Sequence, residues 1–374
     1  MSSARTPDVT PAAARAGGLV YVSADMPGVR RFRWGQTFRY RTAQGAWVRN
    51  PDEIARIRRL AIPPAYSDVW ICPLHNGHLQ ATGIDARGRK QYRYHPEWRA
   101  LKDGTKFDRL EAFGRALPGI RRRVARDLRE GGVARNALLA ALVRLLDVTF
   151  LRVGNEEYAR SNGSYGLTTL RNRHADVRGD SLVLRFRGKG GVVHQARVDD
   201  PRVARIVRRC QQLPGQELFQ YEDAEGLPRA VSSTDVNDYL REISGQDFTA
   251  KDFRTWHGTV LALESLRLAC EGGAEAAGPR TTAILEAVAQ RLGNTPAVCR
   301  KAYVHPAVLA LAASWSAPQG GQESFWTEIA ARVRPSRGLR AAEQRLLVFL
   351  RRQRPATRRR VSAGRQRPER RSRR

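Results

Sequence analysis

The residues of this sequence that could do chemistry together are one tyrosine and a set of cationic and amide side chains between positions 152 and 303. A tyrosine hydroxyl can attack the phosphorus of a phosphodiester, but its pKa of about 10 makes it a poor nucleophile at neutral pH. Neighbouring cations would lower that pKa and stabilise a five-coordinate phosphorus state. Arginine suits this task because its planar guanidinium is permanently charged and matches phosphate oxygens. The candidate residues are Arg152, Lys189, Arg254, Asn294 and Tyr303.

Lys189 is a candidate for the other half of such a reaction, the departure of an alkoxide. An alkoxide is far more basic than a phenolate, so it needs a general acid, and a Lys whose pKa is lowered by neighbouring Arg charges suits that role. Lys189 lies in the segment RGKGG between two expected strands, where a flexible hairpin could bring it to a reacting phosphate. The segment is not a P-loop, because the order GxxxxGK[ST] is absent. The alternative is a solvated lysine at a hairpin tip.

The other candidates each have a structural alternative as well. Arg152 in FLRVGN could cap the carbonyls at the negative end of a helix dipole. Lys251, Arg254 and His257 open a helix in KDFRTWH, and a basic helix start can bind phosphate through charge and free N–H groups. Tyr303, in KAYVHP, would usually be a packing residue if it stood alone. Only the whole set gives these residues a functional meaning.

Residues 79–84 and 89–94, joined by the turn 85–88, predict a basic β-hairpin whose second strand has the sequence RKQYRY. Alternation puts the two tyrosines on one face and the Gln and second Arg on the other. A two-stranded ribbon fits the major groove of DNA, where Gln, Arg and Lys can contact base edges. The alternative is a solvated basic strand whose tyrosines pack on the core. The candidate DNA-binding residues are Arg89, Lys90, Gln91, Tyr92, Arg93 and Tyr94.

The formal net charge of +30 and the isoelectric point near 11.3 imply a polyanionic partner, such as DNA, RNA or an acidic membrane surface. A compositional bias towards Arg explains why only six of the 66 basic residues are Lys, but it does not create the surplus over 36 acidic residues. A membrane fits least. The sequence has neither an apolar run long enough to span one nor a basic amphipathic helix with a bulky apolar face.

The four cysteines are scattered, which predicts no disulfide framework and fits a reducing compartment. Residues 1–18 lack the layout of a signal peptide, so we expect an intracellular protein with a disordered leader. Cys72, His75 and His78 have a ligand-like spacing, but no second cluster completes a tetrahedral site. We therefore expect no metal and no other cofactor.

The elements that must position the candidate residues fall into two domains. Residues 19–97 predict a β-rich N-terminal DNA-binding domain with one helix over 52–60, which ends before Pro63-Pro64. Residues 98–350 predict a larger, mainly helical catalytic domain. Residues 351–374 hold twelve Arg and one Glu, so we expect a disordered basic tail. The expected strands of the first domain are 19–23, 32–40, 47–48, 69–73 and 79–84.

In the larger domain, helices over 107–117 and 120–130 are expected on either side of Pro118-Gly119, and a third over 136–153 is expected to end at Gly154. A small sheet should follow, and helices should then resume up to a helical region over 324–351. The remaining expected strands are 167–170, 175–177, 182–187 and 192–198, and the remaining expected helices are 201–212, 234–243, 250–270 and 281–292.

The order of the five candidate residues resembles the catalytic pentad of type IB DNA topoisomerases, in the poxvirus-like and bacterial branch. The similarity runs from about Gly77 to Pro306. Its strongest segments, in chain order, are GRKQYRY, FLRVGN, FRGKG, KDFRTWHGT, and LGNTP followed by KAYVHP. Five matching segments in one order are far more specific than any of them alone.

This resemblance implies a role for each matching residue. Tyr303 would be the nucleophile, Arg152 and Arg254 would hold the non-bridging phosphate oxygens, and Lys189 would protonate the leaving 5′ oxygen. Asn294 stands where many family members have His, so it can donate a hydrogen bond but carries neither a proton nor a charge for the reaction. The matching DNA-contact positions are Tyr158, Lys251, Gln91, Tyr92 and Tyr94.

The resemblance also implies an α+β fold, in which a small β-rich domain and a larger, mainly α domain close as a clamp around double-stranded DNA. A monomer without a membrane association would suffice. The implied activity is the relaxation of positive and negative supercoils through a 3′-phosphotyrosyl intermediate, without ATP or a metal. The implied location is the cytoplasm, in association with the nucleoid.

Two other functions account for part of the sequence. A tyrosine recombinase shares the catalytic fold and chemistry, but it typically has His-x-x-Arg in the second Arg segment, where this sequence has Lys251 in place of the His. A non-enzymatic nucleoid DNA-binding protein would explain the charge and the basic tail. It would leave the ordered set of five residues as a coincidence.

Overall fold

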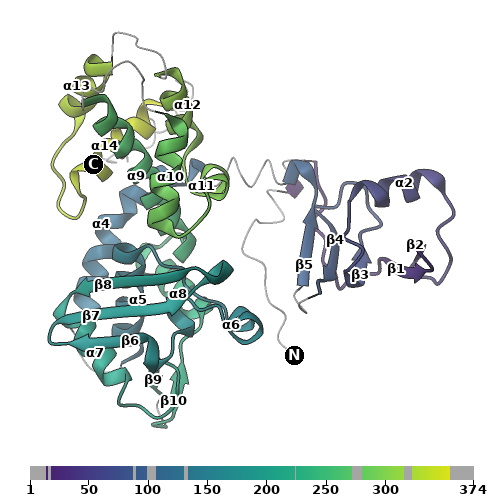
Figure 1. The fold of residues 1–374 in the computed structure, drawn as a ribbon, viewed down its shortest axis with the longest axis horizontal. Helices are drawn as coiled ribbons and strands as arrows, with labels where there is room; N and C mark the ends of the chain where they lie inside the picture. The colour runs from purple at the N-terminus through teal and green to yellow at the C-terminus, as the bar shows by residue number, and fades with distance from the viewer. Residues whose placement is uncertain are drawn as a thin grey trace, which may run out of the picture. The chain divides into compact units, whose positions relative to one another are not determined.

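The computed structural model describes residues 14–15, 18–86, 90–98, 107–129, 134–223, 225–271, 280–315 and 322–353. The chain forms two compact units, Met1–Asp108 and Arg109–Arg374 (Figure 1). The boundary placed at 97/98 from the sequence falls before this division. Most of the expected leader and most of the expected tail lie outside the described residues. The predicted α+β fold class is confirmed, with a β-rich first unit and a mainly helical second unit.

The first unit is built on a five-stranded antiparallel sheet with the strand order β2-β1-β3-β4-β5 (Figure 1). The predicted hairpin of β4 and β5 is confirmed. The prediction of a single strand over 32–40 is wrong, because Gly35 adopts a left-handed φ of 60° and the chain turns back there. Residues 19–23 and 47–48 contribute only isolated bridges. The strands are β1 (Val29–Trp34), β2 (Thr37–Arg41), β3 (Ser67–Ile71), β4 (Leu79–Ile84) and β5 (Lys90–Tyr94).

The two faces of this sheet pack against different parts of the unit. Helix α2 (Pro51–Arg59) begins after Asn50, whose side chain caps it by accepting hydrogen bonds from two backbone N–H groups. Its buried Ile57 packs with Val69 and Ile71 on one face. The intervening residue of β3, Trp70, points to the other face and packs there with Val22 and Leu79. The alternation along β3 therefore divides the unit into two small cores.

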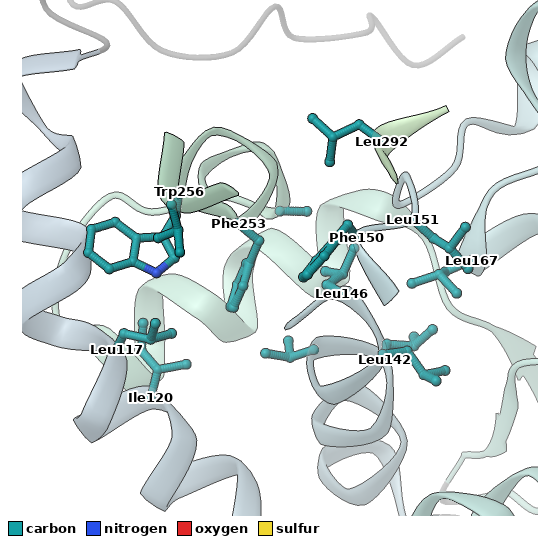
Figure 2. Packing of buried hydrophobic residues seen from close by; sticks show 14 of the residues in the cluster. Leu117, Ile120, Leu142, Leu146, Phe150, Leu151, Leu167, Phe253, Trp256 and Leu292 are labelled. Carbon is teal, nitrogen blue, oxygen red and sulfur yellow. The ribbon is translucent and has the colours of Figure 1, made fainter. Parts of the chain in front are cut away.

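The second unit places a helical bundle beside a three-stranded sheet of order β6-β7-β8. Figure 2 shows Phe253 and Trp256 of the long helix α9 among Leu117, Ile120 and Leu146 of two neighbouring helices. The strands are β6 (Ala175–Arg178), β7 (Ser181–Arg187), β8 (Val193–Asp199), β9 (Gln220–Glu222) and β10 (Pro228–Ala230). The helices are α4 (Leu110–Asp127), α5 (Arg135–Thr149), α6 (Glu156–Asn162), α7 (Pro201–Cys210), α8 (Ser233–Ser244), α9 (Ala250–Glu271), α10 (Thr281–Leu292), α11 (Pro296–Ala302), α12 (Pro306–Ser314), α13 (Gln322–Arg332) and α14 (Ala341–Arg352).

Helix α4 contradicts the expected break at Pro118, because it continues through that residue. A proline inside a helix removes one backbone hydrogen bond and costs about 3 kcal/mol. The buried stripe of α4 continues across it, however, with Phe113 and Leu117 before it and Ile120 and Val124 after it. Burying both halves of that stripe against the other helices outweighs the local cost.

Helix α5 ends at Thr149, earlier than the predicted end at Gly154. Phe150 closes it in the left-handed conformation, with φ 62°, although glycine is the usual residue there. Phe150 is 6% exposed and its ring lies 4.3 Å from that of His257, so tertiary packing sustains the strained backbone. Arg152 therefore lies beyond the helix, and its interpretation as a residue within the helix end is wrong.

One smaller prediction for the second unit is also wrong, and another is refined. The expected strand over 167–170 is a short 3₁₀ turn, Leu167–Thr169. The expected helical region over 324–351 consists of two helices, α13 and α14, and α14 extends through Arg352. The start of the basic tail, placed at residue 351 from the sequence, thus falls inside α14.

Candidate active site

Helix α9 carries the motif KDFRTWHGT and positions Arg254 in the interior of the second unit. The side chain is 4% exposed and donates hydrogen bonds to the carbonyl oxygens of Phe150 and Leu292, the latter at 2.9 Å. The left-handed turn at Phe150 presents one of these carbonyls. The Nε of Arg254 is buried and has no hydrogen-bond partner among the described residues. Two carbonyl oxygens thus hold Arg254 in place, and its Nε–H can still donate to another acceptor.

A buried ionic network one turn further along α9 joins that helix to α4, α5 and α14. His257 is 3% exposed and forms a 3.0 Å hydrogen bond with Asp147 of α5. Arg121 of α4 bridges Asp147 and Glu343 of α14, and Trp256 donates to Glu343 at 3.3 Å. His257, which the sequence grouped with Lys251 and Arg254 at the start of a basic helix, therefore belongs to this internal network.

The backbone around Tyr303 rests directly on α9. Tyr303 follows helix α11, and its carbonyl oxygen accepts a hydrogen bond from the buried hydroxyl of Thr259 at 3.1 Å. The same hydroxyl accepts from the N–H of His305 at 3.2 Å. A Cβ on Gly258 would lie 2.9 Å from the Tyr303 oxygen, so only glycine allows this approach. The residues Gly258 and Thr259 of the motif thus place Tyr303 next to Arg254.

The positive charges around the Tyr303 hydroxyl lower its pKa. Burial by itself would raise the pKa of this group, but the charge and hydrogen bond of Arg254 and the charges of Arg152 and Lys251 outweigh it, so the pKa is lowered. The guanidinium carbon of Arg254 lies 4.9 Å from the centre of the Tyr303 ring. This arrangement meets the requirement for activating a phenol as a nucleophile.

Arg152 and Asn294 meet next to this tyrosine. Arg152 donates hydrogen bonds to the side-chain oxygen of Asn294 and, at 3.4 Å, to the carbonyl oxygen of Gly293. Burial and the nearby charge of Arg254 lower the pKa of Arg152. The Nδ2 of Asn294 is buried without a hydrogen-bond partner among the described residues. Asn294 thus orients Arg152 with its oxygen and retains a buried donor.

Lys189 is exposed on the turn between β7 and β8, where Gly190 and Gly191 have left-handed φ angles of 76° and 81°. The strand pairing of β7 with β8 confirms the predicted hairpin. His194 of β8 connects this hairpin to the other candidate residues, because its ring lies against Gly188 of the hairpin and Gly293 beside Asn294. A Cβ on Gly188 or on Gly293 would come within 2.5 Å of the His194 ring.

His194 was not singled out from the sequence. Its ring stacks on Phe186 at 5.4 Å and lies against Gly293, the residue before Asn294. Burial lowers its pKa, and the charges of Arg152 and Arg254 lower it further. The available signal was the alternation of β8, which turns His194, Ala196 and Val198 towards the core face. His194 therefore joins the Lys189 hairpin to the loop of Asn294.

The candidate DNA-binding residues of the first unit have partners inside the protein. Gln91 donates to Asp85 at 2.9 Å, and Arg93 donates to the Ala61 carbonyl at 2.9 Å. The rings of Tyr92 and Tyr94 stack with centres 6.1 Å apart and are partly buried against Trp70 and its neighbours, as the structural alternative requires. Lys90 is exposed, whereas Arg89 lies outside the described residues.

The two supporting positions of the second unit lie on different helices. Lys251 is exposed in the first turn of α9, and its charge acts on the Tyr303 hydroxyl. Tyr158 belongs to α6, but its side chain lies outside the described part of the structure.

The residues with ligand-like spacing in the first unit have other contacts. The Nδ1 of His78 accepts a hydrogen bond from the N–H of Val22 at 3.0 Å, and its ring stacks on Tyr21 at 4.2 Å. No group of three or more His, Cys, Asp or Glu side chains with metal-ligand geometry occurs among the described residues. In the same residues, no helix is long and apolar enough to cross a membrane.

Comparison with known proteins assigns both units to one family. Residues 95–316 match the catalytic core of eukaryotic DNA topoisomerase I, and residues 37–85 match the N-terminal domain of bacterial DNA topoisomerase IB. The chain is 30% identical over 287 residues to DNA topoisomerase 1B of Acanthamoeba polyphaga mimivirus. This aligned region covers 75% of this chain and 85% of the viral protein. It is 24% identical over 235 residues to DNA topoisomerase 1B of vaccinia virus (strain Copenhagen), covering 61% of this chain and 70% of that protein. The chain therefore belongs to the type IB DNA topoisomerases.

Proposed function

We propose that this protein relaxes positively and negatively supercoiled DNA by cutting one strand transiently, with Tyr303 as the nucleophile. The observation that carries the proposal is the placement of the Tyr303 hydroxyl beside Arg254 and Arg152, whose charges lower its pKa despite burial. The unpartnered donors Arg254 Nε and Asn294 Nδ2 supply two hydrogen bonds for an anion at this place. A non-bridging phosphate oxygen is negatively charged and can accept both hydrogen bonds.

The reaction balances with the residues of this chain. The Tyr303 hydroxyl releases its proton to water, its oxygen bonds to phosphorus and the bond from phosphorus to the 5′ oxygen breaks, so the phosphate stays on Tyr303 at a 3′ end. The 5′ oxygen takes a proton from Lys189 and leaves as a hydroxyl. The reverse reaction rejoins the strand. Because the covalent bond conserves the energy of the broken linkage, religation needs no ATP, and the cationic side chains supply the charge that a metal would otherwise provide.

Asn294 has a narrower role in this proposal than a histidine would have. Its side-chain oxygen accepts from Arg152, so its amide nitrogen points away from that contact and can donate to the phosphate. A neutral amide adds no charge to the reacting group. Arg152 and Arg254 therefore carry the electrostatic stabilisation.

The partner in this proposal is double-stranded DNA, held by the first unit and the second unit of one monomer as a clamp. Lys90, Gln91 and Arg93 of β5 and Lys251 of α9 are the proposed DNA contacts that the structure describes. Gln91 and Arg93 would exchange their present partners for DNA. The net charge of +30 suits a protein of the cytoplasm that is associated with the nucleoid.

The first experiment is relaxation of a supercoiled plasmid by the purified protein in EDTA without ATP, with Tyr303→Phe as the comparison. The wild-type protein should relax both signs of supercoil and form a covalent adduct with a free 5′-OH. Tyr303→Phe keeps the ring and its packing, so DNA affinity should hardly change while adduct and relaxation disappear. A dependence on Mg²⁺ or ATP, or an adduct on another residue, would contradict the proposal. Relaxation without a specific partner site also excludes a recombinase and a purely structural DNA-binding protein.

The role of Lys189 can be tested separately with a modified substrate. Lys189→Ala should slow single-turnover cleavage by roughly 10² to 10⁴-fold, because the leaving oxygen would lose its proton donor. A substrate with sulfur at the 5′-bridging position leaves without a proton, so it should recover most of the lost rate. The control is Lys301→Ala, an exposed lysine two residues before Tyr303. Equal defects of Lys189→Ala on both substrates would show that Lys189 acts in binding alone.

A further inference from the structure

One face of the β1–β2 hairpin in the first unit exposes large aromatic rings between arginines. Phe32, Trp34 and Trp47 are 43%, 55% and 41% exposed. Strand register explains why they lie together, since Phe32 pairs with Arg39 and Trp34 with Thr37, while Trp47 forms a bridge with Arg41. We call this surface the aromatic face. It consists of Arg30, Phe32, Trp34, Arg39, Arg41 and Trp47.

The rings of the aromatic face are not needed for the core. The opposite face of the same hairpin supplies Phe38 and the buried Tyr40, which pack with Val29 and Ile71. The exposed rings instead contact one another and the arginines. Phe32 and Trp47 meet edge to face at 5.8 Å, and the guanidinium carbon of Arg39 lies 4.1 Å from the centre of the Trp34 ring. Three clustered large rings on one exposed sheet face indicate a binding surface.

The arginines of the aromatic face favour a polyanion as its ligand. Arg30 forms an ion pair with Asp68 at 2.8 Å, but in the described part of the chain no carboxylate forms an ion pair with Arg39 or Arg41. Arg41 lies 5.8 Å from the Trp47 ring centre and donates to the carbonyl of Gly45 at 2.6 Å. Both arginines can turn from their aromatic neighbours to phosphates without breaking an ion pair.

The exposed aromatic rings indicate that this polyanion is a nucleic acid with accessible bases. Bases in a duplex stack on one another and hide their faces, whereas unpaired bases stack on exposed aromatic side chains with little dependence on sequence. Rings that alternate with arginines supply both contacts at once, base faces on the indoles and phosphates on the guanidiniums. The occupant with this chemistry is single-stranded DNA.

The position of the aromatic face separates it from the basic strand expected to contact duplex DNA. In the strand order β2-β1-β3-β4-β5, the hairpin forms one edge of the sheet and β5 forms the other. We propose that the aromatic face is a second DNA site, which binds single strands such as those exposed in underwound DNA. This goes beyond strand cleavage by Tyr303, and it is testable by binding alone.

The experiment compares two labelled probes on the full chain by fluorescence anisotropy, an oligothymidylate of about 20 nucleotides and a duplex of similar length. Salt of about 0.2 M weakens the general phosphate contacts of the Arg-rich tail and favours stacking. The test variant is Phe32→Ala/Trp34→Ala/Trp47→Ala. The control is Leu227→Ala/Leu268→Ala, which removes two apolar side chains of similar exposure, 53% and 54%, from the second unit.

Affinity of the test variant for the oligothymidylate should fall by at least about tenfold, and its affinity for the duplex by less than about twofold. The control should match the wild-type protein on both probes. Trp34→Phe alone should keep most of the single-strand affinity because a ring remains, and Trp34→Ala alone should not. These positions are exposed, so the circular dichroism spectrum should not change; the single variants provide the test if the triple variant does not fold.

Two results would overturn the proposal. An equal loss on both probes would make the aromatic face part of the duplex contact. Unchanged single-strand affinity in all variants would show that the rings do not bind bases. The test variant should still relax plasmid DNA, because Tyr303 and its neighbours lie in the other unit. This measurement separates the proposed single-strand site from the proposed catalysis.

Discussion

Two arginines of the second unit, the partly buried Arg121 of α4 and the buried Arg254 of α9, have contrasting surroundings. Arg121 donates to both oxygens of Asp147, at 2.8 and 2.9 Å, and to both oxygens of Glu343, each at 2.8 Å. Arg254 donates to the carbonyl oxygens of Phe150 and Leu292 and to the Tyr303 hydroxyl, and among the described residues no carboxylate forms an ion pair with it. The same side chain is therefore neutralised in one place and uncompensated in the other.

The difference distinguishes an arginine whose charge is compensated within the protein from one whose charge has a partner only in the proposed function, where an anion binds beside it. Burying a charge without a counter-charge costs several kcal/mol, so folding by itself gives no reason to keep Arg254 there. Arg152 adds a second positive charge nearby: burial and the charge of Arg254 lower the pKa of Arg152, and the charges of both arginines lower the pKa of Tyr303. Such a cluster is explained by an anion that binds between these groups, which the proposed function supplies as the scissile phosphate.

Among the changes that test the contrast between Arg121 and Arg254, Arg254→Gln should have the largest effect. This change removes the charge and keeps part of the hydrogen-bonding capacity, so cleavage of a short duplex should slow by roughly 10² to 10³-fold. The melting temperature should stay the same or rise, because an uncompensated buried charge disappears. Single-turnover kinetics and thermal unfolding measure the two quantities. A large loss of stability without a loss of cleavage rate would show that Arg254, like Arg121, has a structural role, and would contradict the contrast between them.

Arg121→Gln should show the reverse behaviour. It leaves Asp147 and Glu343 as buried carboxylates without their counter-charge, so the free energy of unfolding should fall by about 3 to 5 kcal/mol. At a temperature where the variant is folded, its cleavage rate should stay within a few-fold of the wild-type rate. Denaturant unfolding followed by kinetics on the folded fraction tests both statements. A rate defect as large as that of Arg254→Gln would contradict the structural role.

The smallest effect should be the pH dependence of the buried network. Burial would raise the pKa of Asp147, but hydrogen bonds from His257 and Arg121 and their charges lower it below its ordinary value. A group whose pKa is lowered by folding stabilises the folded state above its unfolded pKa of about 4, and this contribution is lost as the pH falls further. The stability difference between wild type and Asp147→Asn should therefore shrink below about pH 4. A difference that stays constant down to pH 2 to 3 would contradict this assignment.

Much of the fold follows from local patterns in the sequence. Helices α7 to α10 and the hairpin of β7 and β8 were predicted to within a few residues, because their apolar spacing and turn signals agree with their final packing. The failures have tertiary causes. Pro118 remains inside α4 because the buried stripe continues across it, and Phe150 ends α5 where no local signal favours a left-handed residue. Both outcomes depend on contacts with residues far away in the chain.

The sequence by itself determined the residue types of the candidate site, their order and the positive charge that implies a nucleic acid partner. Only the tertiary structure decided how they meet. It showed that His257 turns inward to Asp147, that Asn294 orients Arg152, and that His194 joins the lysine hairpin to the loop of Asn294. The physical reason is that residue type and periodicity act along the chain, whereas burial and electrostatic compensation depend on side chains that approach one another only after the chain has folded.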